Sequence, residues 1–124
     1  MRAGLRAALA AISICLALPA AAQDAAPYDE PLLRLSEVLG SLHFLRRLCN
    51  RAEGPVWREA MAALLAAERP APERAKRLTA RFNRGFGAFS RAYTTCTPAA
   101  VRAVELYQAE GARLTAQIVS RYAR

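Results

Sequence analysis

The sequence predicts an all-α protein, folded as an antiparallel four-helix bundle that one disulfide staples. Apolar residues recur at steps of three and four along most of the chain, and no segment alternates as a strand does. Prolines and glycines interrupt this pattern, and the short connections they leave favour neighbouring helices that run in opposite directions. The four expected helices cover residues 29–50, 55–68, 72–93 and 98–122.

The first 22 residues match a secretory signal peptide. Arg2 and Arg6 form a positive amino-terminal region, residues 7–18 are apolar, and three alanines precede a cleavage site before Gln23. The apolar stretch is about 12 residues long, too short to span a bilayer core, which needs roughly 20. We therefore expect a periplasmic protein with no transmembrane segment in its mature chain.

Cleavage leaves about 102 residues, enough for one hydrophobic core. Residues 23–28 are small or polar and are expected to form a mobile tail. Residues 29–124 form a single helical domain. Cys15 leaves with the signal peptide, so the mature chain keeps two cysteines.

The first helix is expected to begin at Asp29, whose carboxylate can cap it, and to end at Asn50, which tolerates a left-handed conformation. Arg46, Arg47 and Arg51 lie near its end, where the helix dipole favours cations. Its predicted buried stripe consists of Leu32, Leu35, Leu39 and Leu42, flanked by Val38, Leu45 and Leu48.

Gly54 and Pro55 open the second helix, and the prolines at 70 and 72 end it. In the third helix, Gly85 and Gly87 are each expected to cost roughly 1 kcal/mol relative to alanine. Apolar stripes follow at helical spacing. They are Trp57, Ala60, Met61, Leu64 and Leu65 in the second helix, and Ala75, Leu78, Phe82, Phe86, Phe89 and Tyr93 in the third.

The fourth helix has the clearest start signal, with Thr97 as N-cap and Pro98 in the first turn. Its stripe has a spacing close to that of a coiled coil and includes the small residue Gly111. This pattern is compatible with packing inside the chain or against a second copy, so the oligomeric state stays open. The stripe consists of Val104, Tyr107, Gly111, Leu114, Ile118 and Tyr122.

Cys49 and Cys96 are predicted to form a disulfide, because two thiols in an oxidising compartment are expected to pair. They are 47 residues apart and form no CxxC motif, which argues against a redox dithiol. In an up-down-up-down bundle, the end of the first helix and the turn before the fourth lie at the same pole. The topology therefore places the two cysteines together.

Three segments, residues 32–49 and 81–100 and the carboxyl-terminal SRYAR, resemble an uncharacterised family of small exported alphaproteobacterial proteins. That family is marked by two well-separated cysteines, and the resemblance extends over residues 28–124. It implies a periplasmic protein and supports the pairing of Cys49 with Cys96. It implies no activity, ligand or catalytic residue.

The chain is basic, with 18 Lys and Arg against 10 Asp and Glu, and loss of Arg2 and Arg6 leaves 16 against 10, a net charge of +6. Such a chain attracts anionic envelope components or an acidic protein, and export argues against nucleic acid. A GC-rich genome would also produce an Arg- and Ala-rich chain without selection for binding. Two rows of arginines on the third and fourth helices form the predicted anion-binding surface. They are Arg77, Arg81, Arg84 and Arg91, and Arg102, Arg113 and Arg124.

No motif predicts catalysis, a metal or a cofactor. His43 is the only histidine, and with two cysteines committed to a disulfide it provides too few ligands for zinc or haem. We interpret it as a buried histidine that bonds a neighbour, with its role left open. A pair of glutamates is the best enzymatic candidate, although no motif singles one out. The candidates are Glu37, Glu53, Glu59, Glu68, Glu105 and Glu110.

The sequence thus favours a non-catalytic periplasmic binding or interaction module with a basic surface. A cell-wall hydrolase that uses paired glutamates is the first alternative. A purely structural or chaperone-like envelope protein, in which charge has no role, is the second.

Overall fold

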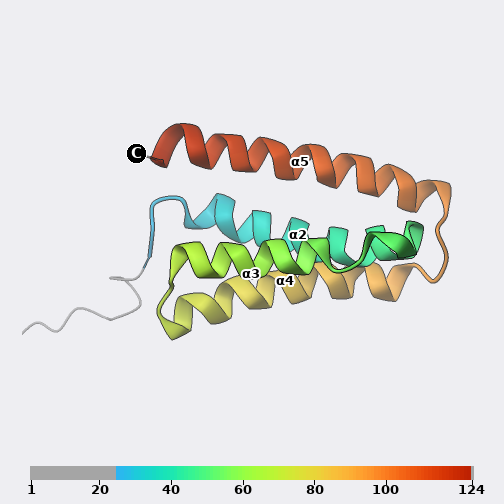
Figure 1. Cartoon of the computed structure of the whole chain (residues 1–124), viewed down its shortest axis with the longest axis horizontal. Helices are drawn as coiled ribbons and strands as arrows, with labels where there is room; N and C mark the ends of the chain where they lie inside the picture. Colours follow the sequence, from blue (N-terminus) through green and yellow to red (C-terminus); the bar gives the residue numbers. More distant parts are fainter. Residues whose placement is uncertain (1–24, 124) are drawn as a thin grey trace, which may run out of the picture.

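The computed structural model describes residues 25–123, and it contains four α-helices and no β-strand within that range. Successive helices run in opposite directions along a common axis (Figure 1). Each helix begins and ends within one residue of its predicted bounds, so the all-α prediction is confirmed. The predicted signal peptide, residues 1–22, lies outside the described residues. The elements are α2 (Asp29–Cys49), the short 3-10 turn η1 (Arg51–Glu53), α3 (Val56–Glu68), α4 (Pro72–Ala92) and α5 (Pro98–Tyr122).

The helix α2 is the centre of the molecule. It packs against α3, α4 and α5, whereas these three helices make few contacts with one another. A helix with neighbours on three sides buries more than one stripe, and α2 accordingly buries polar and small residues that the predicted leucine stripe omits. These are Ser36, Gly40, Ser41 and His43. None of the helices among the described residues has the length and apolar character needed to cross a membrane.

Glycines let the backbones of α2 and α4 touch. A Cβ on Gly40 would collide with the carbonyl group of Phe82, and a Cβ on Gly85 would collide with the carbonyl group of Glu37. Ser41 lies at the same contact and satisfies its own hydroxyl by donating to the Glu37 carbonyl at 2.9 Å. The sequence-based expectation that Gly85 merely weakens its helix is therefore incomplete, because this glycine permits the packing.

The hydrophobic core consists of two clusters, both built on α2. One joins α2 to α5, and the other joins α2 to α3 and α4. Their buried members are Val38, Leu42, Leu45, Ala100, Val104 and Leu114 in the first, and Leu32, Leu39, Met61, Leu78 and Phe82 in the second.

The helix ends differ in part from the prediction. Thr97 caps α5 as expected, since its hydroxyl accepts a hydrogen bond from the Ala100 N–H at 3.1 Å. Asn50 is not left-handed, with φ at −149°, and the left-handed cap residue is instead Arg69 after α3. Asp29 caps nothing, because its carboxylate accepts hydrogen bonds from Arg74.

An ion cluster closes the end of the molecule where α2 begins. Arg74 is only 4 % exposed, and its Nη2 lies 2.6 Å from Asp29 Oδ1 and 2.9 Å from Glu68 Oε2. Tyr28 donates a hydrogen bond to Glu68 at 2.9 Å, and its ring packs 5.4 Å from that of Tyr122. Tyr28, which the sequence places in a mobile tail, thus belongs to the packed part of the chain.

Candidate functional site

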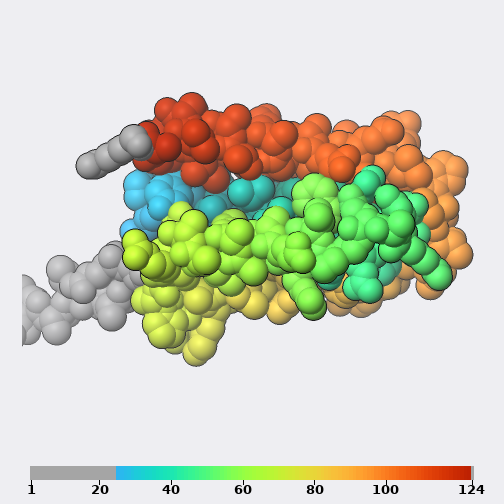
Figure 2. Space-filling view, in the orientation of Figure 1, coloured from blue at the N-terminus to red at the C-terminus, as the bar shows by residue number. Residues whose placement is uncertain are grey.

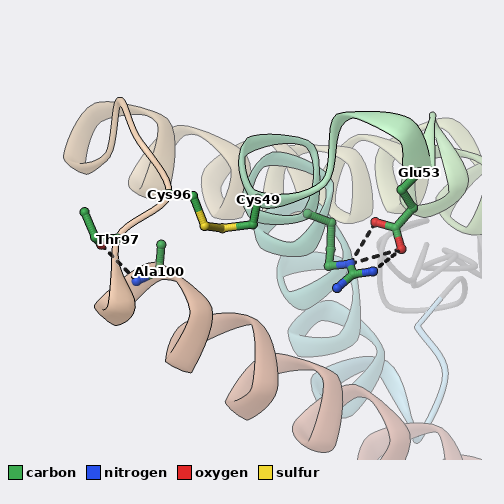
Figure 3. The surroundings of a disulfide bond; sticks show 6 residues. Cys49, Glu53, Cys96, Thr97 and Ala100 are labelled. Atoms are coloured by element: carbon green, nitrogen blue, oxygen red, sulfur yellow. Dashed lines mark hydrogen bonds and ion pairs between the residues drawn. A yellow bond between two sulfur atoms is a disulfide. The ribbon is translucent and has the colours of Figure 1, made fainter.

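A disulfide joins the end of α2 to the turn before α5 (Figure 3). The Cα atoms of Cys49 and Cys96 lie 5.0 Å apart, and the sulfur atoms are bonded at 2.06 Å. Thr97 directly follows the second cysteine, so the N-cap of α5 and the crosslink lie side by side. The predicted pairing is confirmed, and the bond holds the end of α2 next to the start of α5.

The structure places the predicted arginine surface on two separate helices. Arg77, Arg84 and Arg91 are exposed on α4, and Arg102 and Arg113 are exposed on α5. Arg124, the last member of the predicted surface, lies outside the described residues. Because α4 and α5 each pack on α2 rather than broadly on each other, these exposed side chains form two rows.

An ion network bridges α4 to α5 across α2. Arg81, a member of the predicted surface, binds Glu37 with Nη2 at 2.9 Å from Oε2. Glu37 also forms an ion pair with Arg34 at 3.2 Å. Arg34 in turn donates two hydrogen bonds, of 2.8 and 2.9 Å, to the carboxylate of Glu110 on α5. The guanidinium of Arg81 is thus paired within the chain.

A second group of cations, which the sequence analysis did not assign as a site, surrounds a hollow of about 260 Å³ between α2 and α3. We call Arg47, Arg51 and Arg58 the arginine cluster. Together with His43, Gly54 and Pro55 they line this cationic hollow. The three arginines are exposed, and within residues 25–123 none of them has an acidic partner or a hydrogen bond from its side chain.

His43 forms the buried wall of the cationic hollow. It is 6 % exposed, and its Nδ1 is buried without a hydrogen-bond partner. Burial lowers the pKa of His43, and the charges of Arg47 and Arg58 lower it further. The ring is therefore neutral at pH 7 and keeps one N–H donor. The expectation that His43 is buried is correct, but the neighbour it was expected to bond is missing among the described residues.

An apolar hollow of about 480 Å³ adjoins the cationic one. Phe44, Leu48 and Phe86 line it, and Arg47 and Arg51 border both hollows. The ring of Phe86 stands 5.6 Å from that of His43 and 5.5 Å from that of Phe44. The two hollows therefore share two arginines, and His43 of the cationic hollow packs near Phe86 of the apolar one.

A separate apolar groove runs between α3 and α5. In Figure 2 the surface is hollowed there, and α2 is visible at its floor. Two hollows of about 520 and 320 Å³ make up the groove, and they share Leu35, Leu39, Thr115 and Val119 in their lining. No charged residue lines either hollow, so the groove offers mainly apolar packing surface.

The glutamates proposed for hydrolysis are mostly committed to arginines. Glu37, Glu68 and Glu110 are paired as described, and Glu53 binds Arg46 at 2.8 Å. The hydrogen bond from Arg46 lowers the pKa of Glu53, as that from Arg34 lowers the pKa of Glu110. A general acid needs a raised pKa, so these shifts are opposite to the requirement. In the described part of the chain no group of acids, histidines and cysteines could hold a metal ion.

The sequence did contain a signal for the missed site. His43, Arg47 and Arg51 follow one another at steps of four, a spacing that puts residues on one side of a helix. In the structure Arg51 follows the end of α2, in η1, and lines the same hollow. Arg47 and Arg51 were instead explained by their position near the carboxyl end of the helix, where the dipole favours cations, so they were not assigned to a binding site. The contribution of Arg58 depends on how α3 returns along α2, which no local pattern encodes.

Comparison with protein-family models finds one match, over residues 27–122, described as "Protein of unknown function (DUF2385)". Comparisons with curated proteins and with solved structures find no match. The matched region covers the four α-helices of the described residues and both cysteines of the disulfide.

Proposed function

Because the chain belongs to the DUF2385 family of proteins of unknown function, we propose from its own residues that it is a non-catalytic module that binds anions. The anions are phosphate- or carboxylate-bearing components of the bacterial envelope or an acidic protein. The binding site is the arginine cluster together with His43.

One observation carries this proposal: three arginines surround a single hollow without an acid among them. Four other arginines, Arg34, Arg46, Arg74 and Arg81, are instead paired with acids. Guanidinium groups bind phosphate and carboxylate through paired N–H donors, and an unpaired group keeps those donors available. His43 lines the same hollow, and its neutral ring keeps one N–H donor.

The proposal includes the architecture and the compartment. The four helices form an antiparallel bundle that is open between α3 and α5. The protein is exported to the periplasm after cleavage before Gln23. The disulfide supports an oxidising compartment, since such bonds are rare in the cytosol.

The two alternatives receive less support. A cell-wall hydrolase would need an acid with a raised pKa, whereas Glu53 and Glu110 have lowered values. A purely structural or chaperone-like role would leave the unpaired arginine cluster without a purpose.

The test is sedimentation with vesicles of phosphatidylglycerol and phosphatidylcholine, with pure phosphatidylcholine as the neutral surface. We expect the protein to pellet with the anionic vesicles at low salt and to be released at about 0.5 M salt, where charges are screened beyond a few ångströms. Absence of pelleting at low salt would contradict anion binding to a phosphate surface. Clearing of purified wall sacculi by the wild-type protein would favour the hydrolase instead.

A matched pair of variants locates the site. Arg47→Ser with Arg58→Ser removes two charges from the cluster, and Arg84→Ser with Arg102→Ser removes two exposed charges from the predicted rows. We expect the first pair to weaken binding at least tenfold and the second at most about twofold. Equal losses would show that net charge, and not the cluster, carries the binding.

A further inference from the structure

We propose that the arginine cluster binds an aryl phosphate, a planar aromatic ring bonded to a phosphate group, with the phosphate in the cationic hollow and the ring in the apolar hollow. This inference rests on the proposed anion binding and adds the chemistry of the group attached to the anion. The juxtaposition of the two hollows across Arg47 and Arg51 is the observation behind it.

The cationic hollow suits a phosphate. Three arginines line about 260 Å³ from α2, η1 and α3, and they offer more positive charge than a single carboxylate would neutralise. His43, a neutral ring with one N–H donor, also lines this hollow. No acid lines the hollow, so no repulsion opposes a dianion there.

The apolar hollow suits a flat ring. Its lining combines Phe44, Phe86 and Leu48 with the stems of Arg47 and Arg51. The two phenyl rings meet edge to face, with an angle of 83° between their planes, so they present one ring face and one ring edge. An aromatic ligand pairs well with both, and the guanidinium planes at the rim can stack on it. A hollow of about 480 Å³ also lies within the size range of small-molecule sites, roughly 300–1,000 Å³.

The shared lining favours a short link between the two parts of the ligand. Arg47 and Arg51 line both hollows, so a phosphate bound by them in one hollow lies next to the other. A ring joined to the phosphate directly or through one or two atoms suits this arrangement, and phenyl phosphate is the simplest such compound.

The experiment is a titration of the whole mature protein with phenyl phosphate, hexyl phosphate and inorganic phosphate, followed by NMR and by calorimetry. His43 is the only histidine, so its ring protons give an unambiguous signal from the site. We expect phenyl phosphate to bind at least tenfold more tightly than inorganic phosphate and more tightly than hexyl phosphate, with the His43 signals shifted.

Variants separate the two hollows. Phe86→Leu should remove the advantage of phenyl phosphate and leave the affinity for inorganic phosphate within about twofold. Phe44→Leu should do the same, and it serves if the first variant fails to fold. Arg58→Ser, which changes only the cationic hollow, should weaken both ligands by similar factors. Phe89→Leu is the control, because that ring faces Tyr93 and Tyr107 and lines neither hollow.

The outcomes distinguish the two proposals. Equal binding of phenyl and inorganic phosphate would overturn the aryl phosphate and leave anion binding intact. Tighter binding of hexyl phosphate would assign the apolar hollow to an acyl chain and also overturn it. Failure of all three phosphates to bind would overturn the inference, while the vesicle experiment would still decide the proposed function separately.

Discussion

The same substitution, glycine to alanine, should have opposite effects at two positions of this protein. A Cβ at Gly40 would collide with the Phe82 carbonyl group, which is backbone and cannot rotate away. A Cβ at Gly87 would meet only the guanidinium of Arg91, with Nη1 at 2.9 Å, and a flexible exposed side chain can move. The structure therefore predicts different signs from an identical chemical change.

The magnitudes follow from two terms. Alanine is more favourable than glycine within a helix by about 1 kcal/mol, and both glycines lie in helices. At Gly87 this term acts alone, so Gly87→Ala should stabilise the protein by about 0.5–1 kcal/mol. At Gly40 the gain is opposed by overpacking, which typically costs 1–3 kcal/mol and is larger where rigid backbones must separate. We expect Gly40→Ala to lose about 2 kcal/mol net.

Thermal and urea unfolding followed by circular dichroism measure both effects. For about 100 residues, 1 kcal/mol shifts the midpoint by about 4–8 °C, so Gly40→Ala should melt about 8–16 °C lower. Gly85→Ala should behave like Gly40→Ala, because its Cβ would collide with the Glu37 carbonyl. A Gly40→Ala protein as stable as the wild type would refute backbone contact between α2 and α4.

Three further changes test the crosslink and the ion pairs. Replacing Cys49 and Cys96 together with alanine should cost about 4 kcal/mol for a loop of 47 residues, measured by urea unfolding; a loss below 1 kcal/mol would exclude the crosslink as a major stabiliser. Arg74→Met should cost about 3 kcal/mol because it leaves two partly buried carboxylates unpaired, and Arg74→Lys should recover only part of that; equal stability of Arg74→Met and wild type would contradict the pairing. The arginine partner of Glu110 lowers its pKa, so its contribution is present above the unfolded value of 4.5 and is lost as pH falls through the folded value. Glu110→Gln should therefore be less stable than the wild type at pH 7 and equal to it near pH 2, whereas the exposed Glu105→Gln should match the wild type at both.

The helix bounds were predictable because local residues set them. Proline cannot continue a helix, and Thr97 with Pro98 forms a start signal whose chemistry acts within one turn. The disulfide was predictable because topology and compartment lead to the same pairing. Both inferences depend on residues that are close in sequence, or on helix ends that an antiparallel arrangement places at the same end of the molecule.

The surroundings of α2 were not predictable in the same way. Serine is typical of a solvent-exposed helix face, yet Ser36 and Ser41 are both buried. Each hydroxyl donates a hydrogen bond to the backbone carbonyl one turn before it. The spacing of apolar residues indicates one buried side of a helix, whereas α3, α4 and α5 bury several sides of α2. The close contact at Gly40 and Gly85 could not be predicted either. In the sequence, a glycine that permits two helices to touch cannot be distinguished from one that only weakens its own helix.

The arginine cluster owes its unpaired state to a contact on the other side of the same turn. Glu53 is the only acid between residues 47 and 58, and it lies two positions from Arg51. Its carboxylate nevertheless faces Arg46, which donates to it at 2.8 Å, and Trp57, whose indole N–H is 3.4 Å away. The carbonyl groups at the end of α2 carry partial negative charge, which helps the protein hold nearby cations without an acid between them. The turn thus commits the acid nearest in sequence to Arg51 to a different arginine, and the cations of the cluster stay available to an anion from outside.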